Sequence, residues 1–88
     1  MIQQSVRIVN KHGLHTRPAT VFVTQATKFK SDVFVIYNGV RVNAKSILGL
    51  LILAVEPGAK ITIEADGDDE KEAIEKLVAL TQNKFNLE

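Results

Sequence analysis

Two residues in the segment HGLHTRPAT, residues 12–20, could do chemistry together. His15 stands two positions after Gly13 and two positions before Arg17. An imidazole ring exchanges its proton near neutral pH, so one ring nitrogen is available as a nucleophile. A guanidinium keeps its charge and holds phosphate oxygens in a forked geometry. This pair of residue types suits a covalently held phosphoryl group.

The residues around this pair predict the start of a helix. Gly13 permits a sharp turn of the chain, and Pro18 suits the first helical turn. Unpaired N–H groups and the helix dipole together favour an anion at such a helix end. The same pattern also fits a histidine that merely caps the helix or lies on the surface, with Arg17 as a solvated charge. The spacing alone does not decide between these interpretations.

Length and composition limit the class of protein. The chain has 88 residues, 45% of them hydrophobic, so we expect one domain spanning residues 1–88. A net charge of +1 without clustered Lys and Arg argues against nucleic-acid binding.

The absence of cysteine excludes disulfides and thiolate metal sites and is compatible with a reducing cytoplasm. The N-terminus is too polar for a secretory signal, and the longest apolar run, 47–55, is too short to cross a bilayer. We expect a cytoplasmic protein without membrane insertion.

Alternating apolar residues predict four strands. The segment from Ile2 to Val9 alternates, and so does the segment from Lys60 to Ala65. Residues 32–43 are rich in β-branched and aromatic side chains on both sides of Asn38 and Gly39, a pair that favours a two-residue hairpin turn. The second and third strands are therefore predicted to be antiparallel neighbours.

Helical spacing predicts three helices. The first helix is expected from about Thr16 to Thr27, and the second follows Ser46, a good N-cap. The third lies within residues 66–88, a segment that begins with acidic residues, which favour a helix N-terminus. The apolar stripe of the first helix contains Ala19, Phe22, Val23, Ala26 and Phe29. The buried stripe of the last segment contains Ile74, Leu77, Val78 and Phe85.

The order of elements is βαββαβα, which predicts an α+β fold. Because each strand has one polar face, the three helices should cover the other face only. A right-handed crossover between the first two strands, with the fourth strand inserted between them, makes every neighbouring pair antiparallel. We expect an open-faced β-sandwich with strand order 1-4-2-3.

The second helix is apolar on both faces. Leu50 and Leu53 lie on one side, and the other side carries Ile47, Leu48, Leu51 and Ile52. In a domain this thin only one face can pack on the sheet, so the other predicts an exposed patch for a partner. The alternative is a helix buried on both sides, for example in a homodimer.

Two segments of the chain resemble those of a known family. The segments GLHTRPAT and VNAKSILGLL, with the length, the element order and the hairpin, resemble the histidine-containing phosphocarrier protein HPr of the bacterial phosphoenolpyruvate-dependent sugar phosphotransferase system. The resemblance covers essentially the whole chain. It implies that His15 accepts a phosphoryl group on Nδ1 from phosphorylated enzyme I and passes it to the A component of enzyme II. Arg17 and the backbone of Thr16 would bind the phosphate, and such a stoichiometric carrier is no enzyme and needs no metal or cofactor.

The resemblance also assigns roles to the second helix. It favours Leu50 and Leu53 inside, and it makes the outward residues the docking surface of a monomer for enzyme I, enzyme II and regulatory proteins. Ser46 is explained structurally as an N-cap. In many relatives this serine is phosphorylated by HPr kinase/phosphorylase, and the product acts with a catabolite-control transcription factor. Thr16 stands where many relatives have alanine, and His12 stands where relatives often have a small polar residue.

Three other functions are alternatives to the carrier. An HPr-like paralogue in a nitrogen-linked or purely regulatory phosphorelay would share the fold and His15. A metal-dependent hydrolase would need a third ligand beside His12 and His15, and the sequence offers no clear one. A nucleic-acid-binding module would need a basic stripe and surface aromatic residues, which the sequence lacks.

Overall fold

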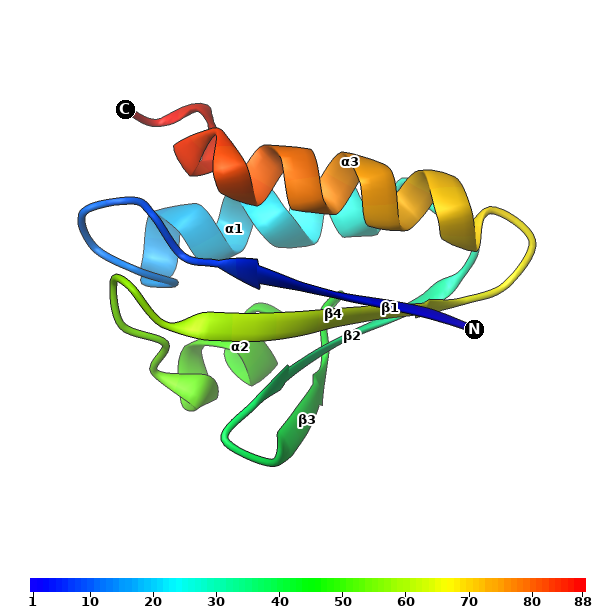
Figure 1. Ribbon diagram of the computed structural model, residues 1–88, viewed down its shortest axis with the longest axis horizontal. Coiled ribbons are helices and arrows are strands. Elements are labelled where there is room, and N and C mark those ends of the chain that lie inside the picture. Colours follow the sequence, from blue (N-terminus) through cyan, green and yellow to red (C-terminus); the bar gives the residue numbers. More distant parts are fainter.

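The predicted strands pair into one antiparallel sheet. The computed structural model describes residues 1–88 and contains β1 (Ile2–Arg7), β2 (Asp32–Tyr37), β3 (Val40–Asn43) and β4 (Lys60–Asp66) (Figure 1). Their order in the sheet is β1-β4-β2-β3, and β4 is antiparallel to both of its neighbours. The predicted strand order is confirmed.

The turn between β2 and β3 has the predicted chemistry. Asn38 and Gly39 have φ values of 51° and 78°, in the left-handed region that asparagine and glycine tolerate best. Tyr37 pairs with Val40 across this turn, and Phe34 pairs with Asn43 at the far end of the hairpin. The two-residue hairpin is therefore confirmed.

Three helices lie where the sequence predicts them. They are α1 (Thr16–Ala26), α2 (Ile47–Leu53) and α3 (Glu70–Gln82). Helices α1 and α3 contact each other and run together along the sheet, whereas α2 contacts α1 and β3 (Figure 1). None of the helices has the length and apolar character needed to cross a membrane.

The core lies between the helices and one face of the sheet. Strand residues alternate: Val33, Val35 and Ile63 are buried, whereas Phe34 on the open face is only half-buried. Glu64, also on the open face, is 4% exposed, and its carboxylate accepts hydrogen bonds from Gln3 and Arg41. The hydrophobic residues of this core are Val6, Ile8, Leu14, Ala19, Phe22, Val23, Ala26, Phe29, Val33, Val35, Ala44, Leu50, Leu53, Val55, Ile61, Ile63, Ala65, Ala73, Ile74, Leu77, Val78 and Phe85.

The end of the chain differs from the prediction. Helix α3 stops at Gln82, so Phe85 does not belong to its buried stripe. Phe85 instead lies in a short 3₁₀ turn, η1 (Lys84–Asn86), in which all three residues have φ values between 56° and 61°. Its ring is fully buried and meets the ring of Phe22 edge-on, with centroids 6.4 Å apart. The left-handed turn brings the aromatic ring back into the core from outside the helix.

Hydrogen bonds also tie the start of α3 to the loop between α1 and β2. The carboxylate of Asp69 accepts hydrogen bonds from the backbone N–H groups of Lys30 and Ser31, at 2.8 and 2.9 Å, and from the Ser31 hydroxyl. These bonds, the Ser31 hydroxyl first among them, lower the pKa of Asp69 to about 2. The loop before β2 is therefore held by an ionised carboxylate.

Candidate functional site

The loop between β1 and α1 is held against the segment that follows α2. Gly13 has a φ of +69°, and a Cβ placed on it would lie 2.3 Å from the carbonyl oxygen of Val55. The next residue, Leu14, is buried and donates its N–H to the same oxygen at 3.0 Å. Only glycine fits this close approach without moving the backbone. The turn that the sequence predicts at Gly13 therefore fixes the residues that follow it.

His15 is the N-cap residue of α1. Its backbone is extended, with φ of −82° and ψ of −170°, and its carbonyl oxygen accepts the N–H of Ala19 at 2.9 Å. The imidazole makes no side-chain capping bond and is exposed to solvent. The histidine that the sequence places at a helix start does lie there, and its side chain is accessible to solvent.

The first turn of α1 leaves backbone donors open. Thr16 and Arg17 occupy the first two helical positions, whose N–H groups have no carbonyl partner within the helix. Pro18 has no N–H to offer, and the first turn contains no acidic side chain. The two open N–H groups and the dipole therefore favour an anion beside His15.

Arg17 is exposed and makes no hydrogen bond or ion pair within the chain. It borders a pocket of about 280 Å³ on the side of the loop where the chain ends. The pocket is lined by Asn10, Lys11, His12, Arg17, Pro18, Leu87 and Glu88. The fold thus brings His12 and Arg17 to one cavity, whereas His15 is not among the residues that line it.

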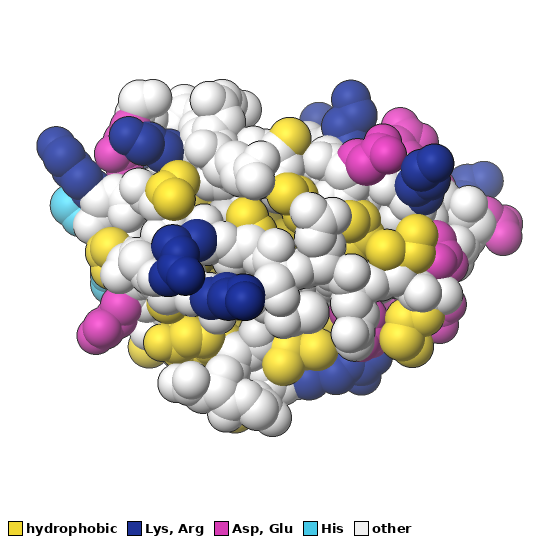
Figure 2. All heavy atoms as spheres, viewed as in Figure 1, with side chains coloured by type: hydrophobic (Ala, Val, Ile, Leu, Met, Phe, Trp, Pro, Cys, Tyr) yellow, Lys and Arg dark blue, Asp and Glu magenta, His cyan; other side chains and the backbone are white.

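The space-filling view shows where the charged side chains lie. Both histidines belong to the loop between β1 and α1, and they lie at one end of the molecule beside a basic side chain (Figure 2). Acidic and basic side chains occur at both ends of the molecule (Figure 2). The preference for an anion beside His15 therefore depends on the first turn of α1 and not on the overall charge distribution.

Helix α2 exposes an apolar surface, as predicted. The exposed fractions of Ile47, Leu48 and Ile52 are 40%, 68% and 67%, and we call these three residues the α2 patch. Leu51, predicted to belong to the same surface, is half-buried and packs against the core. Leu50 is fully buried, in agreement with the prediction. Because the segment after α2 contacts the loop at Gly13, the α2 patch and His15 belong to neighbouring parts of the surface.

Ser46 is the N-cap of α2. Its hydroxyl oxygen accepts the backbone N–H of Gly49 at 3.1 Å, as expected of a capping serine. The side chain is half-buried and directly precedes Ile47 of the α2 patch. A modification of this hydroxyl would therefore change the charge at the edge of an apolar surface.

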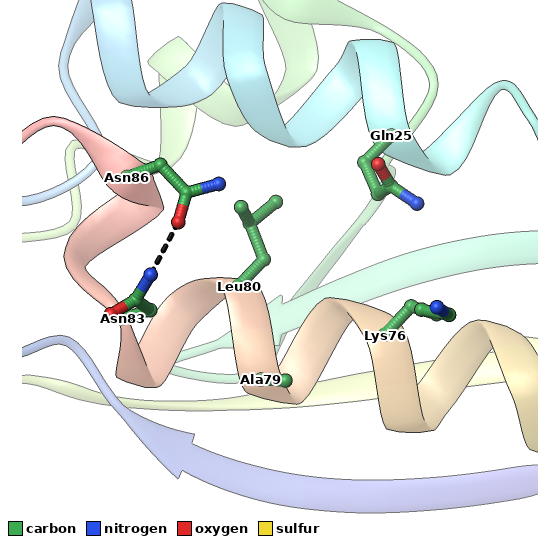
Figure 3. A pocket seen from close by; sticks show the side chains of 6 residues that line it. All are labelled: Gln25, Lys76, Ala79, Leu80, Asn83 and Asn86. Carbon is green, nitrogen blue, oxygen red and sulfur yellow. Dashed lines mark hydrogen bonds between the residues drawn. The ribbon is translucent and has the colours of Figure 1, made fainter.

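The largest cavity of the molecule is elsewhere. It has a volume of about 440 Å³ and lies between α1, α3 and η1 (Figure 3). Its lining consists of Gln25, Lys76, Ala79, Leu80, Asn83 and Asn86, and the amides of Asn83 and Asn86 are hydrogen-bonded to each other (Figure 3). Lys76 is its only titratable residue, and no histidine or arginine lines it, so we place the candidate site at the His15 loop. The structure contains no group of three or more His, Asp or Glu side chains arranged to hold a metal ion.

Two polar residues near the site carry no clear signal in the sequence. Asn10 is 3% exposed; its Nδ2 donates to the carbonyl of Gly13 at 2.8 Å, and its Oδ1 has no partner. Glu88, far away in the sequence, accepts the backbone N–H of Lys11 at 2.8 Å. Both hydrogen bonds hold the loop between β1 and α1: the bond from Asn10 lies within the loop, and the bond to Glu88 joins the loop to the last residue.

The comparisons with known proteins agree with this geometry. A family model described as "PTS HPr component phosphorylation site" matches residues 2–83. The HPr-like protein Crh of Bacillus subtilis is 52% identical over 82 residues, which are 93% of this chain and 96% of Crh. The phosphocarrier protein HPr of Buchnera aphidicola is 52% identical over 77 residues, which are 88% of this chain and 91% of that protein.

Solved structures give the same result. HPr of Thermoanaerobacter tengcongensis superposes with a TM-score of 0.96 at 46% identity, covering 100% of this chain and 99% of that one. Crh of Bacillus subtilis, described as a swapped, intertwined dimer, is 51% identical with a TM-score of 0.77, covering 96% of this chain and 97% of Crh. With its fold, its exposed histidine at a helix start and these relatives taken together, the chain belongs to the HPr family of phosphocarrier proteins.

Proposed function

We propose that this chain carries phosphoryl groups in a phosphoenolpyruvate-dependent sugar phosphotransferase system, accepting them on His15 from phosphorylated enzyme I and passing them to enzyme II A components. The observation that carries this proposal is the exposed, uncapped ring of His15 at the N-terminus of α1, in a chain that a phosphorylation-site family model matches. Relatives in the family are named phosphocarrier proteins. We therefore describe the chain, residues 1–88 acting as one domain, as a stoichiometric carrier and not as an enzyme.

The chemical step needs little beyond positioning. The unprotonated Nδ1 of His15 attacks the phosphorus of the donor phosphohistidine. A new P–N bond forms while the donor P–N bond breaks, and the departing imidazole keeps the electron pair. Onward transfer repeats this exchange with His15 as the donor. In-line phosphoryl transfer of this kind depends mainly on alignment and on stabilising the charge of the transferred group.

Three groups in the first turn of α1 supply that stabilisation. The open N–H groups of Thr16 and Arg17, together with the helix dipole, would stabilise the oxygens of the transferred group. The guanidinium of Arg17, which has no partner within the chain, binds two oxygens in both transfers. The step uses no metal ion and no cofactor.

Partners dock on the α2 patch. Its three exposed apolar side chains support this assignment, since such surfaces usually mark partner sites. A shuttle must release each partner, so we expect small and transient interfaces with enzyme I and with enzyme II. These partners lie at the cytoplasmic side of the sugar transport system, and we place the carrier in the cytoplasm.

We propose a monomer as the working form, because docking requires the α2 patch to be free. Crh of Bacillus subtilis forms a swapped dimer in one structure, and one structure of Thermoanaerobacter tengcongensis HPr is also described as a dimer. These relatives make a dimer the competing form. The molar mass in solution, measured by light scattering over a range of concentrations, distinguishes the two.

Ser46 is the proposed regulatory site. Phosphorylation by an HPr kinase/phosphorylase would add charge at the N-terminus of α2, where the dipole tolerates it. The same charge would lie beside Ile47 of the α2 patch and weaken docking of enzyme I. The modified protein would then be available to a catabolite-control transcription factor. A Ser46→Asp variant should accept phosphate on His15 more slowly than the wild type.

A purely regulatory role is the second candidate. It is favoured by the 52% identity with Crh of Bacillus subtilis, an HPr-like protein, which equals the identity with the Buchnera phosphocarrier. Because a paralogue in a nitrogen-linked or purely regulatory phosphorelay would share His15, transfer of the phosphoryl group from His15 to a sugar-specific enzyme II A component is the observation that distinguishes the two candidates.

Incubation with enzyme I and phosphoenolpyruvate tests the proposal. Intact mass should show one added phosphoryl group, stable in alkali and lost in acid, and transfer to an enzyme II A component should remove it. The His15→Ala variant should gain nothing, whereas His12→Ala should be labelled. Equal labelling of His15→Ala and the wild type would refute the proposal.

A further inference from the structure

One peptide unit just before His15 is held at both of its polar ends. The carbonyl oxygen of Gly13 accepts a hydrogen bond from Asn10 Nδ2 at 2.8 Å. The N–H of the next residue, Leu14, donates to the carbonyl oxygen of Val55 at 3.0 Å. The two groups belong to the same planar peptide, so hydrogen bonds at its opposite ends fix its orientation.

The glycine in this peptide makes support from outside necessary. Gly13 has a φ of +69° and no Cβ, so its own sterics leave the direction of the following peptide open. The residue is buried, and its carbonyl oxygen therefore needs a donor from within the protein. The amide of Asn10, which is itself 3% exposed, is the only donor to this oxygen within the chain.

The two groups that hold the peptide belong to segments that are bonded to each other. Ile8, directly after β1, donates its N–H to the carbonyl oxygen of Ala59 and accepts the N–H of Gly58, both at 2.8 Å. These bonds join the start of the loop that contains Asn10 to the segment that contains Val55. The peptide therefore cannot turn without breaking one of its own two hydrogen bonds.

The orientation of this peptide determines how the chain enters His15. Only Leu14 lies between them, and its side chain is 2% exposed and packed in the core. On the other side, the carbonyl oxygen of His15 accepts the N–H of Ala19 at 2.9 Å. No side-chain capping bond holds the ring of His15. The position of that ring at the start of α1 therefore depends on the backbone that precedes it.

We propose that Asn10 is a positioning residue for phosphoryl transfer. Its Nδ2 fixes the peptide between Gly13 and Leu14 and thereby holds His15 beside the open N–H groups of the first turn of α1. Asn10 acts through the backbone and needs no contact with the phosphoryl group. This inference rests on the proposed carrier function and deepens it, because in-line transfer depends on the alignment of the acceptor.

Two variants of Asn10 and a matched control test this role. Asn10→Leu removes the donor and keeps a side chain of similar size and branching, and Asn10→Ala removes the donor without adding apolar bulk. The control is Thr81→Val in α3, because Thr81 is fully buried and its hydroxyl donates to the Leu77 carbonyl oxygen at 2.8 Å. Each change removes one buried donor to a backbone carbonyl, but only the changes at Asn10 affect the His15 loop. Urea unfolding establishes that each variant is folded under the assay conditions.

The kinetics of phosphorylation by enzyme I separate alignment from docking. Both Asn10 variants should lower kcat about tenfold and leave the KM of the carrier within about twofold, because they disturb the acceptor and not the α2 patch. Thr81→Val should leave both constants unchanged. In ¹⁵N spectra, the amide signals of Leu14, His15 and Thr16 should shift in the Asn10 variants and stay in place in Thr81→Val.

Three results would overturn the positioning role while the carrier function stands. They are a wild-type kcat in both Asn10 variants, a raised KM with an unchanged kcat, and an equal loss of kcat in Thr81→Val. Failure of the wild type itself to gain a phosphoryl group would instead refute the carrier function, and the positioning role with it.

Discussion

Replacing Gly13 with alanine should disturb the His15 site more than the fold. The added Cβ would lie 2.3 Å from the Val55 carbonyl oxygen, whereas ordinary contacts begin at 3.4 Å. The loop must therefore move by about 1 Å, and a shift of that size in a reacting group can cost up to about 100-fold in rate. We expect Gly13→Ala to accept phosphate from enzyme I about 10- to 100-fold more slowly than the wild type.

The cost in stability has two parts. A non-glycine residue in the left-handed region costs about 1–2 kcal/mol, and loss of the Leu14 N–H bond to Val55 costs about 0.5–1.5 kcal/mol. We therefore expect a loss of about 2–3 kcal/mol in the free energy of unfolding. Domains of ordinary stability unfold at a cost of about 5–15 kcal/mol, so the variant should remain folded and can be assayed.

Gly39 provides the matched control. Its φ is +78°, similar to that of Gly13, but a Cβ placed on it meets no atom within 4 Å. Gly39→Ala should therefore show the backbone cost alone, about 1–2 kcal/mol, and an unchanged rate of phosphorylation. Urea unfolding followed by circular dichroism gives the stabilities, and the enzyme I reaction gives the rates. If the two variants had equal stability and equal rates, the close approach at Val55 would have no role in positioning His15.

The remaining predictions concern three other sites. The pKa of Asp69 lies at about 2, below the ordinary 3.8, so the contribution of its carboxylate to stability is complete above about pH 5 and disappears as the pH falls through 2. The difference in unfolding free energy between the wild type and Asp69→Asn should therefore shrink over this pH range. A constant difference would contradict the assignment. Leu48→Ala should change stability by less than about 0.5 kcal/mol but raise the KM for phosphorylated enzyme I about tenfold. Val40→Ala, also at an exposed apolar residue, should change neither quantity. Equal KM values for the two variants would exclude the α2 patch as the docking surface. Ser46→Ala should lose about 1 kcal/mol of stability through the missing cap and accept phosphate on His15 at the wild-type rate. An unchanged urea midpoint would show that the hydrogen bond from Gly49 N–H to Ser46 contributes nothing to stability.

Local chemistry made most of the fold predictable. Asn38 and Gly39 favour left-handed backbone by themselves, and they form the predicted turn. Ser46 caps α2 as its side chain allows, and His15 lies at the start of α1. In each of these cases neighbours in the sequence determine the structure, so periodicity and turn chemistry are sufficient.

The features that escaped prediction depend on distant residues. Phe85 leaves the helix because its ring packs on Phe22. Asn86 favours the left-handed turn that this requires, but Lys84 and Phe85, which adopt it too, do not. Asp69 binds the N–H groups of Lys30 and Ser31, which lie 39 and 38 positions earlier. The burial of Asn10 likewise follows from tertiary packing. Such contacts are set by how the elements meet in space, which periodicity does not report.

The position of the phosphoryl group on the chain tests the central claim most directly. After reaction of ¹⁵N-labelled protein with enzyme I and phosphoenolpyruvate, a phosphorus–nitrogen correlation in the NMR spectrum identifies the ring atom that carries the phosphorus. We predict one phosphoryl group, on Nδ1 of His15. Phosphorus found on His12, or no phosphorylated histidine at all, would contradict it.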